Sequence, residues 1–228
     1  MYYNYKTYPS PNSKSVIFFA APYGVKIKQL QWAIRSLQKE GFTVVAYDAD
    51  EQILTLGDPK LLEDTVYKIA KDIKEQIKAY KSGGYDDFGF FGSSIGAFMM
   101  YYCVATIREL RWGVLNTGGD AVAAVWKKKD LREYHEENGM DKKDLERAWR
   151  KIQHPRFRHM NGKKILFISS TKDQLLPRDE IDPYIEPMRE AGATVDIQEV
   201  NIWRHSFTVL FGLVQAKKLV RTIHLAKE

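Results

Sequence analysis

Residues 87–96 read DFGFFGSSIG and join a short apolar run to a tight turn. The run is typical of a buried β-strand, and the apolar residues that continue to about Leu110 predict a long, buried helix. The turn between them, Gly92-Ser93-Ser94-Ile95-Gly96, needs glycine at both ends because strand and helix backbones approach closely there. We therefore expect Ser94 at the apex of the turn, at a helix N-terminus that favours a developing negative charge.

Five other strands are predicted, and helical patterns separate most of them. They span residues 16–21, 43–47, 113–116, 164–170 and 194–200. Strands joined by helices pair in parallel with right-handed crossovers. The last strand alternates apolar and polar residues, as a half-buried edge strand does. The predicted fold class is therefore α/β, with a doubly wound, mostly parallel sheet.

The length of 228 residues fits one α/β domain, residues 1–228, with an insertion. The composition changes over residues 120–160, which hold 11 Lys or Arg and 8 Asp or Glu. Two helical patterns occur there, at about 122–134 and 142–152. We interpret residues 120–160 as an inserted helical lid. Two ordinary surface helices are the alternative.

The overall charge of +6 permits an acidic ligand or a nucleic-acid surface but demonstrates neither. No nucleic-acid-binding motif is present, so nucleic-acid binding is the least expected function. The N-terminus shows no signal peptide, and no apolar stretch reaches the roughly 18 residues that a membrane span requires. We expect a soluble, cytoplasmic protein. The single cysteine, Cys103, excludes an intrachain disulfide and is predicted to be a small buried side chain.

No cluster of His, Cys, Asp or Glu has the spacing of metal ligands, and no glycine-rich phosphate loop precedes a helix. We expect neither a metal nor a cofactor. The sequence does not indicate the oligomeric state.

Three chemically reactive side chains follow strands of the predicted sheet. Ser94 follows the third strand, Asp173 the fifth and His205 the sixth. The carboxyl ends of parallel strands are where open α/β sheets bind ligands. A serine hydroxyl needs a base to take its proton; imidazole serves near neutral pH, and a carboxylate orients it. Asp120, which follows the fourth strand, is the alternative acid, and a surface position is the alternative for His205.

In these features the chain resembles the α/β-hydrolase superfamily, from about Val16 to the C-terminus. Residues 92–96 resemble the nucleophile elbow, 171–173 the acid turn and 204–206 the histidine loop. The resemblance implies that Ser94 is the nucleophile, His205 the general base and then acid, and Asp173 its orienting partner. The family's two leading antiparallel strands are missing here or compressed into residues 1–14.

The resemblance also implies an oxyanion hole with one donor from the backbone N–H of Ile95 and another from the loop after the first strand. That loop often begins with His-Gly in the family, whereas residues 21–24 read APYG here. Proline has no N–H, so the backbone of Tyr23 is the best candidate for the second donor, and that of Gly24 the next.

We therefore expect a serine hydrolase that cleaves small carboxylic esters, or thioesters, through an acyl-enzyme. Three aromatic residues of the 120–160 segment are predicted to contact an apolar acyl chain: Trp126, Tyr134 and Trp149. Residues 127–129, all lysine, would attract an anionic head group, or else form a solvated helix end. The alternative function is a non-catalytic binding or scaffolding domain with a basic face.

Overall fold

The computed structural model describes residues 3–55 and 58–225. Its sheet contains the strands β1 (Tyr3–Tyr8), β2 (Ser15–Ala20), β3 (Thr43–Ala49), β4 (Asp87–Ser93), β5 (Trp112–Asn116), β6 (Lys164–Ser170) and β7 (Thr194–Val200). The strand order is β1-β3-β2-β4-β5-β6-β7, and only the β1–β3 pair is antiparallel. The six strands predicted from the sequence are confirmed, as is the edge position of β7.

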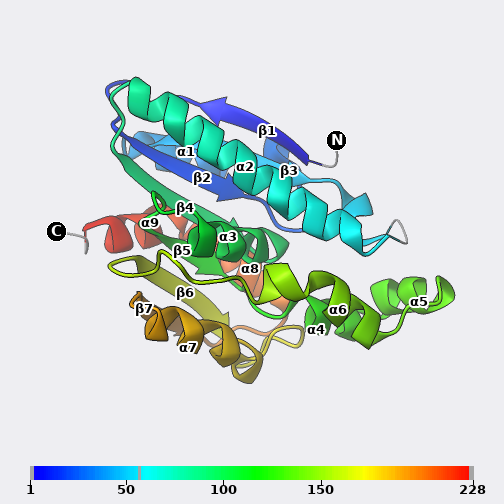
Figure 1. Ribbon diagram of the computed structural model, residues 1–228. Coiled ribbons are helices and arrows are strands. Elements are labelled where there is room, and N and C mark those ends of the chain that lie inside the picture. Colours follow the sequence, from blue (N-terminus) through cyan, green and yellow to red (C-terminus); the bar gives the residue numbers. More distant parts are fainter. Residues whose placement is uncertain (1–2, 56–57, 226–228) are drawn as a thin grey trace.

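Helices cover both faces of this sheet (Figure 1). The α-helices are α1 (Gln31–Lys39), α2 (Lys60–Ser82), α3 (Ile95–Thr106), α4 (Ala121–Lys127), α5 (Lys129–Glu137), α6 (Lys142–Gln153), α7 (Asp182–Glu190), α8 (His205–Val214) and α9 (Ala216–Leu225). Short 3₁₀ turns, η1 (Ile27–Leu30), η2 (Glu51–Leu54) and η3 (Arg178–Glu180), lie in the connections. None of the described helices is long and apolar enough to cross a bilayer.

The two faces of the sheet belong to separate apolar clusters. Val16 and Phe18 of β2 pack with α2, α3, α6 and α7, whereas Ile17 and Phe19 pack with α1, α8 and α9. Alternate residues of a strand point to opposite faces, so a strand buried on both sides is apolar throughout. This arrangement explains the uninterrupted apolar runs in the sequence.

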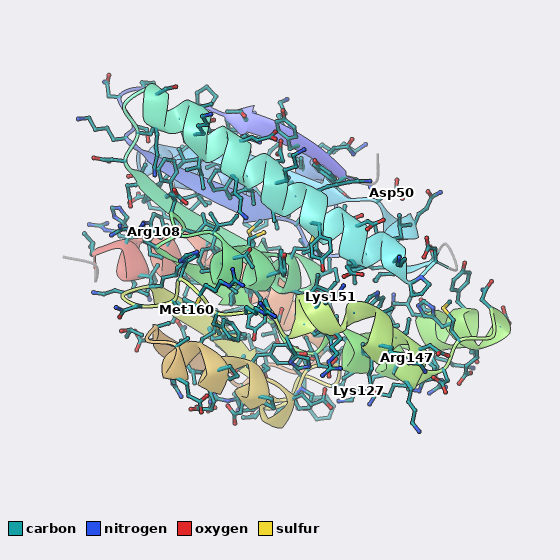
Figure 2. The ribbon with its side chains drawn as sticks, viewed as in Figure 1. Asp50, Arg108, Lys127, Arg147, Lys151 and Met160 are labelled. Carbon is teal, nitrogen blue, oxygen red and sulfur yellow. The ribbon has the colours of Figure 1, made fainter. Side chains whose placement is uncertain are left out.

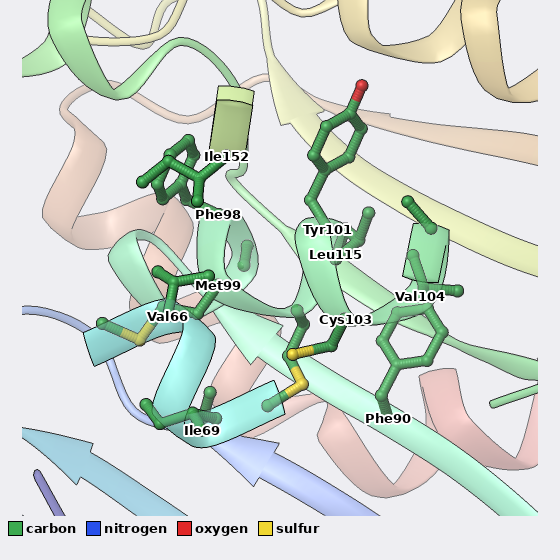
Figure 3. Close-up of a cluster of buried hydrophobic side chains, with 14 of the residues drawn as sticks. Val66, Ile69, Phe90, Phe98, Met99, Tyr101, Cys103, Val104, Leu115 and Ile152 are labelled. Carbon is green, nitrogen blue, oxygen red and sulfur yellow. The ribbon is translucent and has the colours of Figure 1, made fainter. Parts of the chain in front are cut away.

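Helix α3 lies in the larger cluster, between the sheet and α2, and nearly all its side chains are buried (Figure 3). Its cysteine, Cys103, is fully buried, and burial raises the pKa of the thiol to about 12. The prediction of a buried structural cysteine is confirmed. The central position of α3 also fixes the turn that precedes it.

The structure places one antiparallel strand within residues 1–14, where the sequence analysis left the family's two leading strands either missing or compressed. One antiparallel strand, β1, pairs with β3, with Tyr3 opposite Ala49 and Tyr8 opposite Val44. The rings of Tyr3 and Tyr5 lie 6.2 and 5.8 Å from that of Tyr47. The prediction about a signal peptide concerns the N-terminus, and its first two residues, Met1 and Tyr2, lie outside the described residues.

The helical segment predicted at about 122–134 is divided into two helices. The backbone of Lys128 is extended, with φ −84° and ψ 107°, and separates α4 from α5. Gln215 separates α8 from α9. Apolar residues of α4 and α5 pack in one cluster, and those of α8 and α9 pack in the other. The apolar periodicity therefore continues through each break and does not reveal the change of direction.

Lys163 is a buried lysine whose amine closes the C-terminus of α3. Its Nζ donates to the carbonyl oxygens of Val104 at 2.7 Å and Ile107 at 2.6 Å. Burial lowers the pKa of this amine to about 7. A neutral amine keeps two hydrogens and can still donate to both carbonyls.

The low pKa of Lys163 predicts how stability changes with pH. Between about pH 7 and 10, the unfolded chain holds this proton and the folded chain has lost it, so the free energy of unfolding rises with pH. Urea denaturation at pH 7.0, 8.0 and 9.0 should show a steeper rise for the wild type than for Lys163→Met. Equal slopes in the two proteins would contradict the low pKa.

Candidate active site

Ser94 lies at the sharp turn between β4 and α3. Its backbone has φ 54° and ψ −121°, a strained conformation for a residue with a side chain. Its N–H donates to the carbonyl of Asn116 on β5 at 2.9 Å, which fixes the turn against the sheet. The Ser94 hydroxyl lines an open cavity at the carboxyl end of β4.

The two glycines of the turn allow the close approach that the sequence predicts. A Cβ at Gly92 would lie 2.4 Å from the carbonyl oxygen of Gly96, and one at Gly96 would lie 2.3 Å from that of Ala20. Both contacts involve backbone atoms, so neither can be relieved by a side-chain rotation. The turn, α3 and the end of β2 are therefore held in one arrangement.

The Gly96→Ala variant is expected to lower the free energy of unfolding by about 2 kcal/mol or more, because the new methyl group overlaps the backbone of Ala20. Urea denaturation measures this change. The control is Gly83→Ala at the end of α2, where φ is −87° and the nearest atom would be 3.3 Å away. Similar losses in the two variants would argue against a special constraint at Gly96.

His205 and Asp173 form a chain of hydrogen bonds with Ser94. The Ser94 Oγ lies 2.8 Å from His205 Nε2, and His205 Nδ1 lies 2.8 Å from Asp173 Oδ2. If Nδ1 carries the proton and donates to the carboxylate, Nε2 is left as an acceptor for the serine hydroxyl. The structure thus brings together the three residues that the sequence singled out.

Backbone donors hold Asp173 in this position. Its Oδ1 accepts from the N–H groups of Leu175 at 2.9 Å and Leu176 at 3.1 Å, while Oδ2 faces His205. The Asp173 side chain is fully buried and that of His205 is 13% exposed. A buried carboxylate that accepts several hydrogen bonds is rigid and can orient an imidazole.

Asp120, the alternative acid, has a different role. It is the N-cap residue of α4, where its Oδ1 accepts from the N–H of Ala123 at 2.9 Å. Asp173 is the carboxylate that contacts His205 among the described residues. A second His–Asp contact, between His224 and Asp87, lies at the start of β4, at the opposite end of that strand from Ser94.

The residues predicted to supply oxyanion donors lie in the same cavity as Ser94. Ile95 is the first residue of α3, and the first N–H groups of a helix have no acceptor within the helix. Tyr23 belongs to the loop after β2, and the close approach of Gly96 to Ala20 brings this loop against the start of α3. Both Tyr23 and Ile95 line the cavity that contains Ser94.

This cavity, which we call the Ser94 cavity, has a volume of about 540 Å³. Most of the residues in its wall are apolar, and they come from several parts of the chain, among them Leu54, Phe98, Val125, Leu131, Leu176 and Val209. Trp32 and Leu210 also line it and are 45% and 48% exposed. Lys128 is the one lysine or arginine among the described residues of the wall. The space therefore suits an apolar group attached to a reacting carbonyl.

The three aromatic residues predicted to contact substrate lie outside the described wall of this cavity. Trp149 is 1% exposed in the core, and its Nε1 donates to the carbonyl of Pro59. Tyr134 packs edge-on against the ring of His135. Trp126 lines a neighbouring hollow. Helical periodicity places these side chains on one side of a helix, but it does not indicate which side faces the cavity.

Asn116 is a residue of this site that sequence reasoning missed. Besides accepting from Ser94 through its carbonyl, it donates from Nδ2 to Ser93 Oγ at 2.7 Å and to the carbonyl of Val209 at 3.1 Å. Val209 lies on α8, the helix that begins with His205. Asn116 thus ties the turn that carries the serine to the helix that carries the histidine. A polar residue at the end of an apolar strand was the available signal.

In the described part of the chain, no group of three or more His, Cys, Asp or Glu is placed to hold a metal ion.

Comparison with known proteins identifies the architecture. No family model and no curated protein matches the sequence. Among solved structures, the esterase Pf2001 of Pyrococcus furiosus superposes with a TM-score of 0.60 over 97% of this chain and 92% of its own, at 14% identity. Est1E from Butyrivibrio proteoclasticus gives 0.64 over 99% and 94%, at 12% identity.

An acylaminoacyl peptidase of Pyrococcus horikoshii also gives a TM-score of 0.64, at 14% identity, over 96% of this chain but 40% of its own. The similarity extends over nearly the whole of the present chain in each case, and the mostly parallel seven-stranded sheet agrees with it. The chain has the α/β-hydrolase fold.

Proposed function

We propose that the protein is a serine hydrolase that cleaves carboxylic esters or thioesters through an acyl-enzyme. The observation that carries this proposal is the continuous chain of two 2.8 Å contacts from the Ser94 hydroxyl through His205 to the buried carboxylate of Asp173. Ser94 and His205 both line an apolar cavity. The names of the structural neighbours, two esterases and a peptidase, agree with a hydrolase.

The reaction begins when His205 Nε2 takes the proton of Ser94 as Oγ bonds to the acyl carbon. Asp173 keeps the proton of Nδ1 in place and stabilises the imidazolium that forms. The imidazolium then gives its proton to the leaving alkoxide or thiolate, and the acyl group stays on Ser94. Water then attacks the acyl carbon while His205 takes its proton as base. The bond between Ser94 Oγ and the acyl group breaks, Oγ takes the proton back from His205, and the acid is released.

The negative charge of each tetrahedral intermediate needs donors on the side away from His205. We assign the N–H groups of Ile95 and Tyr23 to this role, together with the positive end of the α3 dipole. Loss of one such donor typically lowers kcat by about 100-fold or more.

The acyl group would occupy the Ser94 cavity, and we propose that residues 120–160 act as its lid. Helix α4 supplies Ala121, Ala124 and Val125 to the wall, and α5 supplies Leu131. In Figure 1, α4, α5 and α6 lie together at one end of the molecule, with α5 farthest out. These helices would therefore set the length of acyl chain that fits.

We expect the wild type to favour p-nitrophenyl octanoate over the acetate, because the cavity wall is apolar and each buried methylene contributes about 0.8 kcal/mol. Ala124→Phe fills part of the cavity and should lower the octanoate-to-acetate ratio of kcat/KM at least about 10-fold. The measurement is spectrophotometric release of p-nitrophenol.

The control for this variant is Ala148→Phe. Ala148 is also half-buried on a helix of the 120–160 segment, but it packs against the core and is not a described residue of the cavity wall. Its ratio should match the wild type. A ratio that falls equally in both variants would place the acyl group elsewhere.

A further inference from the structure

A basic hollow adjoins the Ser94 cavity, with a volume of about 880 Å³. Its charged and aromatic lining consists of Lys127, Lys128, Arg132, Lys142, Glu180 and Trp126. We propose that this basic hollow binds a phosphate group on the leaving group of the substrate. The inference rests on the proposed hydrolase function and extends it to a substrate class: acyl esters or thioesters of a phosphate-bearing alcohol or thiol.

The two spaces meet beside the catalytic residues, at Lys128 and Leu175, which line both. Leu175 follows Asp173 closely, and its N–H holds the Asp173 carboxylate. The Nζ of Lys128 lies 5.0 Å from the ring centre of Tyr23, the residue assigned to the oxyanion hole. A substrate that reacts at Ser94 can therefore extend past these residues into the basic hollow.

The charges of the basic hollow favour an anion. Four cationic side chains and one carboxylate line it. Lys127 pairs with Glu180, Lys128 with Asp130 at 3.2 Å, and Lys142 with Glu146 at 3.8 Å. Arg132 has no carboxylate within 4.0 Å among the described residues. The four cations of the basic hollow therefore face three carboxylate partners, which leaves an excess of one positive charge.

Two of these pairs can give way to a ligand at low cost. The side chains of Asp130 and Glu146 are 68% and 51% exposed, and exposed pairs contribute about 0–1 kcal/mol each. A phosphate carries more charge than a carboxylate, and its oxygens fit the donor fork of Arg132. Lys127, labelled in Figure 2, lies at the end of the molecule formed by α4 and α6.

The division between the two spaces decides which half of the substrate carries the phosphate. The acyl side would occupy the apolar Ser94 cavity, where an unpaired phosphate would lose its hydration. The leaving group occupies the other side of Lys128. For a thioester, Ser94 Oγ bonds to the acyl carbon, the C–S bond breaks, and the departing sulfur takes the proton held by His205 Nε2.

The test compares matched substrates with and without phosphate. One arm uses S-octanoyl-4′-phosphopantetheine against S-octanoyl-pantetheine, and the other uses dioctanoylglycerol phosphate against dioctanoylglycerol. We expect the wild type to favour the phosphate-bearing member of at least one pair by about 10-fold or more in kcat/KM, with the preference reduced at high salt. The arm that responds identifies the thiol or the lipid as the source of the phosphate.

The variant Arg132→Ala/Lys142→Ala should reduce that preference at least about 10-fold, since it removes two cations from the basic hollow. The control is Lys129→Ala. The Lys129 side chain is 78% exposed, pairs with Glu133 at 3.5 Å and lies outside the described lining of both spaces, so its preference should match the wild type.

The outcomes separate this inference from the function on which it rests. Cleavage of all four substrates with no preference for phosphate, or with a preference that the double variant retains, would overturn the basic hollow and leave the hydrolase standing. If the wild type cleaves p-nitrophenyl octanoate but none of the four, only the inference about the basic hollow is overturned. If it cleaves neither the four nor p-nitrophenyl octanoate, both are overturned.

Discussion

The Ser94→Ala variant is expected to hydrolyse p-nitrophenyl octanoate with a kcat roughly 10⁴- to 10⁶-fold below the wild type, because no other group replaces the attacking oxygen. The Ser94 hydroxyl lies 2.8 Å from His205 Nε2, and Ser94 lines the cavity proposed to hold the substrate. Removal of one oxygen at a strained turn should leave the fold intact. Steady-state kinetics with purified protein, beside a thermal unfolding curve, measures both properties.

Ser93→Ala is the matched control for this variant. Ser93 is the preceding residue, is fully buried, and accepts a hydrogen bond from Asn116 Nδ2 at 2.7 Å. Its loss should lower stability by about 1–3 kcal/mol, because a buried donor is left without its acceptor, with a much smaller loss of turnover. If folded Ser94→Ala kept a tenth of the wild-type kcat, Ser94 would not be the nucleophile.

The Asp173→Asn variant is expected to lose about 10⁴-fold in kcat with little change in shape. An amide can accept from Leu175 and Leu176 as the carboxylate does, and its NH₂ group then donates to His205 Nδ1. This donation moves the imidazole proton to Nε2, where it blocks removal of the Ser94 proton. The measurement is kcat across pH 6 to 9.

Asp120→Asn provides the comparison. Asparagine caps a helix about as well as aspartate, so α4 should stay intact, and kcat should stay within a few-fold of the wild type. A large loss in Asp120→Asn with little loss in Asp173→Asn would reverse the assignment of the acid.

The strands and the mostly parallel sheet could be predicted from the sequence because the relevant signals are local. Each strand buried on both faces is an apolar run, as in Val16–Ala20, and the Gly92–Gly96 turn carries its own steric requirement. The positions of Ser94, Asp173 and His205 then followed from one rule, that parallel strands end at the same edge.

The features that the sequence does not reveal depend on contacts between segments that are distant in sequence. Trp149 is an aromatic residue on an amphipathic helix whether it faces the core or a cavity, and only the packing of α6 against α2 decides between the two. Strand β1 is held in place by contacts of the Tyr3 and Tyr5 rings with the ring of Tyr47, which lies more than forty residues away in the sequence. The pairing of Lys128 with the ring of Tyr23 likewise depends on the tertiary fold.

Covalent labelling of Ser94 tests the central claim most directly. The wild type, Ser94→Ala and His205→Ala are incubated with a fluorophosphonate, and each intact mass is measured. The proposed chain of hydrogen bonds predicts one adduct on the wild type and none on either variant, because the probe reacts with a serine only when a base activates it. A folded wild type that stays unlabelled would contradict the serine hydrolase and favour a non-catalytic binding domain.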